Sequence, residues 1–162
     1  MRIFFAIWPP ADSARALAQW AREAQRQTGG TLTQEEKIHL TLAFLGDADP
    51  ARAIAAARRI QAEPHTLPME EARYWRDNRI VWAGPRETPP PLAGLFKRLE
   101  LALYKEDFIL ERRPFTAHVT LIRKASAVQS LPPLPAVKWP VGEFVLVSSS
   151  GSSYETLERF SL

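Results

Sequence analysis

Two short segments of the chain share the pattern histidine, apolar residue, threonine. The first occupies residues 39–41 (His-Leu-Thr) and the second residues 118–120 (His-Val-Thr). Each lies in a run that alternates polar and apolar residues, which is typical of a strand with one buried face. Since side chains two positions apart point to the same face of a strand, each histidine is expected beside its threonine. If the two strands lie adjacent, two imidazoles and two hydroxyls line one cleft.

Such a set of groups suits acid–base catalysis at phosphorus. Histidine has an unperturbed pKa of about 6.5, so one imidazole can remove a proton from the nucleophile while the other protonates the leaving oxygen. The hydroxyls of Thr41 and Thr120 can donate hydrogen bonds to non-bridging phosphoryl oxygens. This chemistry needs no metal, and no histidine and carboxylate cluster with ligand spacing stands near the motifs. We therefore expect neither a metal site nor a cofactor.

A single histidine on a strand usually has no catalytic role, so the repetition of the motif carries the argument. The chain has three histidines, and two of them, His39 and His118, occur in the same local pattern. The third, His65, lies between Pro64 and Thr66 and is expected in a surface loop. The alternating apolar side chains of the first motif are predicted to pack in the core; they are Ile38, Leu40, Leu42 and Phe44.

The elements that must position these motifs follow from hydrophobic periodicity and from the positions of glycine and proline. The first half of the chain is predicted to form a strand over residues 2–8, a helix capped by Asp12 or Ser13 that stops at Gly29, the first histidine strand ending at Gly46, and a helix from Pro50 to Pro64 capped by Asp49. The second half is predicted to form a hairpin over 71–83, a helix over 92–103, a short strand over 108–113 and the second histidine strand. A loop over 132–140 and two closing strands over 141–148 and 154–160 complete the prediction.

The short connections and the hairpin favour antiparallel pairing, which predicts an α+β fold rather than a doubly wound parallel sheet. The motifs are 118 − 39 = 79 residues apart, almost half of the 162-residue chain. We therefore predict one bilobal domain over residues 1–162, in which two similar antiparallel sheets, flanked by helices, surround a central cleft that carries the motifs.

Composition sets further bounds. The chain contains no cysteine, which excludes a disulfide framework and thiolate metal sites and suits a reducing compartment. The apolar run over residues 3–8 is too short to span a membrane and lacks the cleavage site of a signal peptide. The net charge is only +3, but arginine outnumbers lysine, and arginine is the better ligand for phosphate oxygens. We expect a cytoplasmic monomer without a membrane partner.

Four segments together carry a resemblance to a known family. Residues 2–7, 39–46, 115–123 and 147–162 resemble, in this order and spacing, the opening strand, the two His-x-Thr motifs and the closing strands of the 2H phosphoesterase superfamily. More narrowly, the chain resembles the RNA 2′,3′-cyclic phosphodiesterases, formerly called 2′-5′ RNA ligases. The resemblance implies a bilobal fold and hydrolysis of RNA 2′,3′-cyclic phosphate ends to 2′-phosphates. It also implies weak 2′-5′ ligation as the reverse reaction.

The same resemblance implies a role for each site residue. His39 corresponds to the acid that protonates the leaving 3′ oxygen, and His118 to the base that activates water. The groups that bind substrate would be Thr41, Thr120, Arg123 and an aromatic ring of the opening strand, for which we predict Phe5 rather than Phe4.

Two departures from the family pattern affect this assignment. Strict alternation places Arg123 on the face opposite His118, so Arg123 reaches the cleft only if the strand bends or ends there. Ala117 stands where the family commonly has proline, and we expect this difference to be harmless.

Two alternatives compete with hydrolysis of RNA ends. One keeps the chemistry but takes a small cyclic nucleotide or an ADP-ribose cyclic phosphate as substrate, because specificity lies in loops at the cleft edge. The other is a non-catalytic RNA-binding module of the same fold. A module without activity is expected to have lost at least one of the four motif residues, and all four are present.

Overall fold

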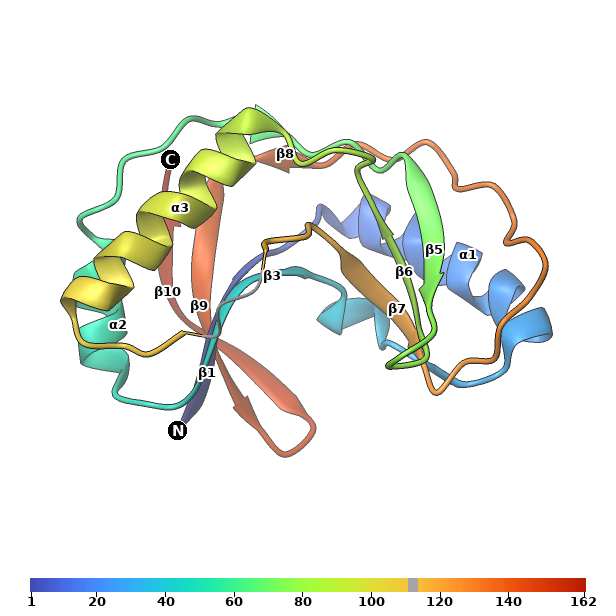
Figure 1. Ribbon diagram of the computed structural model, residues 1–162, viewed down its shortest axis with the longest axis horizontal. Coiled ribbons are helices and arrows are strands. Elements are labelled where there is room, and N and C mark those ends of the chain that lie inside the picture. Colours follow the sequence, from blue (N-terminus) through green and yellow to red (C-terminus); the bar gives the residue numbers. More distant parts are fainter. Residues whose placement is uncertain (111–113) are drawn as a thin grey trace.

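The computed structural model describes residues 1–110 and 114–162 and contains two four-stranded antiparallel sheets (Figure 1). The first, here called the β3 sheet, has the order β10-β9-β1-β3 and consists of β1 (Arg2–Ile7), β3 (Leu40–Asp47), β9 (Glu143–Ser150) and β10 (Ser153–Ser161). The second, here called the β7 sheet, has the order β2-β7-β6-β5 and consists of β2 (Thr31–Leu32), β5 (Glu71–Trp75), β6 (Ile80–Gly84) and β7 (Val119–Arg123). The predicted α+β bilobal architecture is thus confirmed.

In the described part of the chain, three α-helices cover the outer faces of the two sheets, and a short 3₁₀ helix precedes the first motif. They are α1 (Ala11–Thr28), α2 (Pro50–Ala57), α3 (Pro90–Lys105) and η1 (Glu35–Lys37). Helix α1 packs on the β7 sheet, whereas α2 and α3 pack on each other beside the β3 sheet (Figure 1). Because β1 and α1 are consecutive but belong to different lobes, the lobes are interleaved along the chain. Within the described residues, no helix is both long and apolar enough to cross a membrane.

One continuous cluster of buried apolar side chains joins the two lobes. It includes Phe5 and Leu40 of the β3 sheet, Val81 and Leu121 of the β7 sheet, and the fully buried Trp139. Burial of this apolar surface is the main stabilising contribution to the fold. The relative position of the two sheets, and hence of the two motifs, is therefore held by packing.

The helix boundaries follow the predictions at some ends and depart from them at others. Helix α1 stops at Gly29, and Asp49 caps α2 by accepting a 3.0 Å hydrogen bond from the Ala51 N–H. At the start of α1, however, Pro10 is the N-cap and makes no side-chain cap hydrogen bond; Asp12 lies in the first turn, and the Ser13 hydroxyl donates to the Lys138 carbonyl. Helix α2 also ends earlier than predicted, at Ala57, where tight turns replace the α-helical hydrogen bonds.

The segments without regular structure differ from the predictions in two places. Residues 108–110 form no strand, and the rest of the strand predicted over 108–113 lies outside the described residues. The predicted proline-rich loop is irregular up to Trp139, but β8 (Pro140–Val141) then pairs with β4 (His65–Thr66). His65 is therefore part of a short strand with a half-buried side chain and does not lie in a surface loop.

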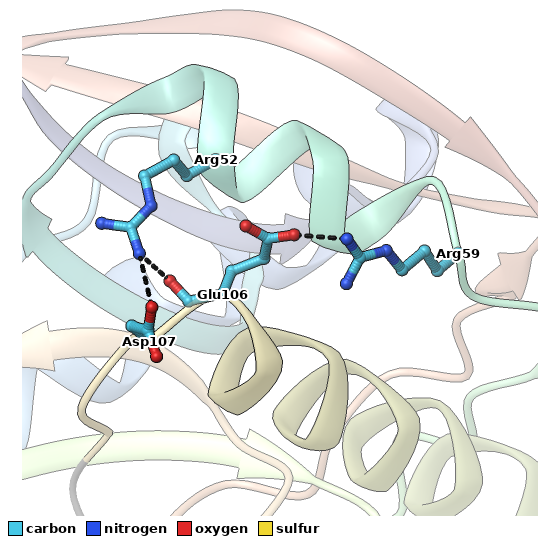
Figure 2. Close-up of polar contacts among 4 residues, drawn as sticks. All are labelled: Arg52, Arg59, Glu106 and Asp107. Atoms are coloured by element: carbon cyan, nitrogen blue, oxygen red, sulfur yellow. Dashed lines mark hydrogen bonds and ion pairs between the residues drawn. The ribbon is translucent and has the colours of Figure 1, made fainter.

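Two arginines, Arg52 of α2 and Arg59 just beyond the end of α2, contact the C-terminal end of α3 (Figure 2). Arg59 forms a 2.5 Å ion pair with Glu106, the residue that caps α3. Arg52 donates to the Glu106 carbonyl and lies 3.5 Å from Asp107. Positive charge is favourable at this end of a helix, where the backbone carbonyls lack partners. The contacts anchor the start of the connection that leads to the second histidine motif.

A β-bulge in β3 and another in β7 change which side chains face the space between the sheets. In β3, Ala6 pairs with Thr41 and Phe5 with Ala43, so Leu42 is an extra residue. Because of this extra residue, the side chains that follow it in β3 point to the opposite face from the one that strict alternation predicts. Phe44, which was predicted in the core, is therefore 54% exposed.

The second bulge lies in β7. Trp82 pairs with Thr120 and Val81 with Ile122, which leaves Leu121 as the extra residue. Leu121 and Ile122 are both buried, and Arg123 then returns to the face that carries Thr120. The sequence analysis expected Arg123 to reach the cleft only if the strand bends or ends there, and this bulge is such a bend.

Candidate functional site

A cavity of about 300 Å³ lies where β3 and β7 approach each other. Both predicted histidines and both predicted threonines line it, together with Arg123. Its other lining residues are Thr31, Leu32, Thr33, Gln34, Lys37 and Tyr154. The structure thus brings together five of the six site residues predicted from the sequence, and the exception is Phe5.

The local backbone orients the imidazole of His39. Its Nδ1 lies 2.6 Å from the Lys37 carbonyl oxygen and its Nε2 lies 2.9 Å from the Thr41 hydroxyl oxygen. A carbonyl oxygen can only accept a hydrogen bond, so Nδ1 must carry a proton and donate. Nε2 is therefore the nitrogen that can take or give a proton within the cavity.

The second motif repeats this arrangement. His118 Nδ1 lies 2.9 Å from the Thr116 carbonyl oxygen and donates to it, which again leaves Nε2 as the reactive nitrogen. Two tryptophan rings contact the His118 ring, and their planes are steeply inclined to it. The distance between ring centres is 4.7 Å for Trp75 and 6.2 Å for Trp82. Each imidazole is thus held by a carbonyl two residues before it in the chain.

Burial lowers the pKa of both histidines below the usual range. The positive charge of Arg123 lowers both values further, and His118 also lowers that of His39; the hydrogen bonds to the backbone carbonyls act in the opposite direction. Both rings are consequently neutral in the free protein near neutral pH. A bound anion would offset the charge of Arg123 and raise both pKa values, so binding itself favours protonation of one ring.

Two features of the cavity were not predicted. Lys37 lines it and places its Nζ 4.8 Å from the centre of the Tyr154 ring. Lys37 stands two residues before His39, a spacing that was visible in the sequence. Tyr154 belongs to the closing hairpin, and only the tertiary structure brings it to the site. Lys37 and Arg123 make the cavity favourable for an anion.

The predicted role of Phe5 is wrong. Its side chain is fully buried and packs against Phe144 and Phe160 at ring distances of 5.9 and 6.1 Å. Phe4 faces the site instead, with its ring 5.1 Å from His39, but Tyr154 covers it and only 4% of it is exposed. Neither phenylalanine of the opening strand offers a free face to a ligand.

Accessible aromatic surface lies on the other side of His118. A hollow of about 240 Å³ is bounded by Thr41 and His118 and is lined by the rings of Phe44, Phe96 and Phe115. Phe96 and Phe115 stack at 4.3 Å with their planes only 15° apart. We will call this space the aromatic hollow; its apolar walls suit a flat ring held next to His118.

The chemistry available at the site is proton transfer and hydrogen bonding to an anion. In residues 1–110 and 114–162, no three or more His, Cys, Asp or Glu side chains are grouped so that they could hold a metal ion. The groups that converge on the cavity are two imidazoles that share one tautomer, two hydroxyls and two cations. They match the requirements of an in-line displacement at a phosphodiester.

Comparisons with known proteins agree with this chemistry. The family described as LigT like Phosphoesterase matches residues 7–82. The RNA 2′,3′-cyclic phosphodiesterase of Escherichia coli K12 is 34% identical over 99% of this chain and 96% of its own length. A protein of the same name from Thermus thermophilus is 30% identical over 100% of this chain and 90% of its own. The crystal structure of E. coli LigT complexed with 3′-AMP superposes with a TM-score of 0.92 at 32% identity, covering 99% of this chain and 97% of that one.

Proposed function

The chain belongs to the LigT-like phosphoesterase family, and on this basis we propose that it hydrolyses the 2′,3′-cyclic phosphate ends of RNA to 2′-phosphates. The observation that carries the proposal is the cavity in which His39 and His118 each keep Nε2 available beside a threonine and Arg123. All of these groups come from one chain, so a monomer is sufficient for activity.

The reaction adds one water across one P–O bond. His118 Nε2 takes a proton from water as its oxygen attacks phosphorus, and the bond from phosphorus to the 3′ oxygen breaks. His39, protonated on Nε2, gives its proton to that leaving oxygen, which becomes the 3′ hydroxyl. The phosphate stays on the 2′ oxygen. A ribose 5′ hydroxyl in place of water would give a 2′-5′ linkage by the same steps.

The remaining groups of the cavity stabilise the charged phosphoryl oxygens. The hydroxyls of Thr41 and Thr120 donate hydrogen bonds to them, and Arg123 supplies positive charge. The substrate's negative charge raises the pKa of His39 and so supplies the proton that the leaving oxygen needs. No step requires a metal or a cofactor.

The base of the terminal nucleotide occupies the aromatic hollow in this proposal. That hollow shares Thr41 and His118 with the cavity, so a base there leaves its cyclic phosphate between the two imidazoles. The half-buried ring of Phe115 and the exposed ring of Phe44 supply the stacking surface that the family resemblance had led us to expect at Phe5.

The proposal is tested by incubating the protein with the four nucleoside 2′,3′-cyclic phosphates and identifying the products by phosphorus NMR. We expect 2′-phosphates as the only products, at an unchanged rate in excess EDTA. An ADP-ribose cyclic phosphate in the same assay examines the alternative substrate class. Formation of 3′-phosphates, a requirement for a divalent ion, or turnover of the ADP-ribose compound alone would contradict the proposal.

A further inference from the structure

A third hollow, of about 460 Å³, lies on the β7 sheet beyond His118. It shares Phe115 and Thr116 with the aromatic hollow, which in turn shares Thr41 and His118 with the catalytic cavity. Neighbouring spaces in this series, which begins at the phosphate site, therefore share lining residues. We will call the third space the tryptophan hollow, because Trp75 and Trp82 form part of its wall.

Strand register explains why these side chains gather on one face. Arg73 pairs with Trp82, and Trp82 pairs with Thr120, so their three side chains lie in a row across β5, β6 and β7. Trp75 follows Arg73 by two residues and points to the same face. Arg73 and Trp75 belong to β5, which is the edge strand of the sheet, so the row leads from the catalytic cavity to the sheet margin.

Two tryptophans in contact make the wall of the tryptophan hollow rigid. Trp82 is only 4% exposed, and its indole Nε1 has no accessible surface from which to contact a ligand. Trp75 is half-buried and stacks obliquely on Trp82 with ring centres 4.8 Å apart, so its position is held before a ligand arrives.

The charges around the tryptophan hollow suit a phosphodiester. Arg73 and Arg86 line it and are exposed, and Glu71 offsets part of their charge through a 3.1 Å ion pair with Arg73. The backbone N–H of Arg86 donates to the Glu70 carboxylate at 3.1 Å, which fixes the backbone that carries this guanidinium. Aromatic stacking surface next to arginine is the combination that single-stranded nucleic acids require.

We propose that the tryptophan hollow binds the nucleotide that precedes the cyclic phosphate end, so that the enzyme prefers an RNA chain to a cyclic mononucleotide. This inference rests on the proposed function. An RNA with a 2′,3′-cyclic phosphate continues only through the 5′ oxygen of its last nucleotide. The chain leaves the aromatic hollow past Phe115 and Thr116, stacks its penultimate base on Trp75, and places the joining phosphate near Arg86.

The test compares kcat/KM for a cyclic mononucleotide with kcat/KM for a trinucleotide that ends in the same cyclic phosphate. The wild type is expected to prefer the trinucleotide by about tenfold or more, from one stacked base and one phosphate contact. Arg86→Ala should lower kcat/KM for the trinucleotide by about three- to tenfold and leave the mononucleotide unchanged, because Arg86 does not line the catalytic cavity. The slope of log kcat/KM against log salt should also fall by about 0.7.

Two further variants make the result specific. Arg26→Ala removes the same charge from an exposed position on α1, the helix behind the sheet, and should change neither rate. Trp75→Ala removes the stacking surface and should lower the ratio of the trinucleotide rate to the mononucleotide rate by about fivefold or more. The ratio is the readout because Trp75 also contacts His118.

The outcomes separate the two proposals. Turnover of both substrates at equal kcat/KM, or equal losses in Arg86→Ala and Arg26→Ala, would overturn the tryptophan hollow as a nucleotide site and leave the proposed function standing. If neither the mononucleotide nor the trinucleotide is hydrolysed, the proposed function fails. Binding of a fluorescent trinucleotide 2′-phosphate then decides the tryptophan hollow alone, and equal affinity for wild type and Arg86→Ala would reject it.

Discussion

At the scale of single residues, the two imidazoles are prepared for proton transfer by the same device. A carbonyl two positions before each histidine holds Nδ1–H, which leaves Nε2 to act on the substrate. If one ring is the base and the other the acid of a single displacement, both serve one transition state. His39→Ala and His118→Ala should each lower kcat/KM by about 10²- to 10⁴-fold.

The double variant should be little slower than the slower single variant, because groups that act as a unit are not additive. The matched control is His65→Ala, which removes the remaining histidine, outside the cavity, and should leave kcat/KM unchanged. Additive losses would show that the two rings act independently.

The two roles are distinguished by the leaving group. A phosphodiester whose leaving oxygen is activated needs little protonation, so it should restore the rate of His39→Ala but not that of His118→Ala. Rescue of His118→Ala instead would exchange the roles of the two histidines. Rescue of neither would count against acid–base catalysis by this pair.

The hydroxyls of the two threonines are expected to stabilise negative charge on the phosphoryl oxygens. Thr41→Val and Thr120→Val keep the shape of the side chain and remove the hydroxyl, so kcat should fall by about ten- to a thousandfold while the fold is kept. Thr41→Ser retains the hydroxyl and should retain most of the activity. Thr156→Val, on β10 and outside the cavity, is the control. Wild-type turnover in both cavity variants would make the threonines structural.

The pH dependence follows from the lowered pKa values of His39 and His118. The free enzyme is active when one ring is protonated and the other neutral, so kcat/KM should follow a bell with its maximum below about pH 6.5. Arg123 lowers both pKa values. Arg123→Gln should therefore move the bell to higher pH and reduce its height, since the phosphate loses a positive partner. If the pH of maximum kcat/KM is the same in Arg123→Gln as in the wild type, Arg123 does not lower the pKa values of the histidines.

At the scale of elements, β7 is positioned by a close approach of its end to the loop after α1. Gly30 has φ = +93°, and a Cβ at this position would lie 2.3 Å from the Arg123 carbonyl oxygen. Gly30→Ala must therefore displace the backbone that carries Arg123, in addition to the cost of about 1–3 kcal/mol for a non-glycine residue in this conformation. Both the midpoint of unfolding and kcat/KM for the cyclic nucleotide should fall.

The neighbouring Gly29 separates these two effects. It also has a positive φ, +62°, but a Cβ there would meet nothing within 4 Å. Gly29→Ala should lower stability through the backbone alone and leave kcat/KM close to that of the wild type. Equal activity of the two variants would mean that the approach of Gly30 to Arg123 has no bearing on the site.

At the scale of the whole molecule, a single core connects the two lobes that supply the two histidines. We propose that residues 1–162 form one cooperative domain. Urea unfolding should then show one transition, at the same midpoint by far-UV circular dichroism and by tryptophan fluorescence, since Trp20, Trp82 and Trp139 are all buried in the folded chain. Two separated transitions would indicate that the lobes unfold independently.

The amino-acid sequence by itself determined the parts of this protein that depend on local alternation and on local breaks. The placement of each histidine in the same cavity as the threonine two residues on, the end of α1 at Gly29, and the cap of α2 at Asp49 each involve neighbours within a few residues. The near-half-chain spacing of the two motifs and the antiparallel elements between them were sufficient to predict the bilobal α+β fold.

Only the tertiary structure decided which side chains the site contains beyond the motifs. Each bulge is defined by the register of a strand on its partner, so alternation alone predicted Phe44 in the core and placed Arg123 on the face opposite His118. The prediction for Phe5 was wrong for a related reason. Alternation shows that Phe4 and Phe5 point to opposite faces of the strand, but it does not show which of the two faces the cavity. The catalytic cavity and the tryptophan hollow likewise join residues far apart in the chain. Tyr154 reaches the histidines because it packs on the small apolar cluster that contains Phe4 and Val147, and strand pairing across β5, β6 and β7 gathers the walls of the tryptophan hollow.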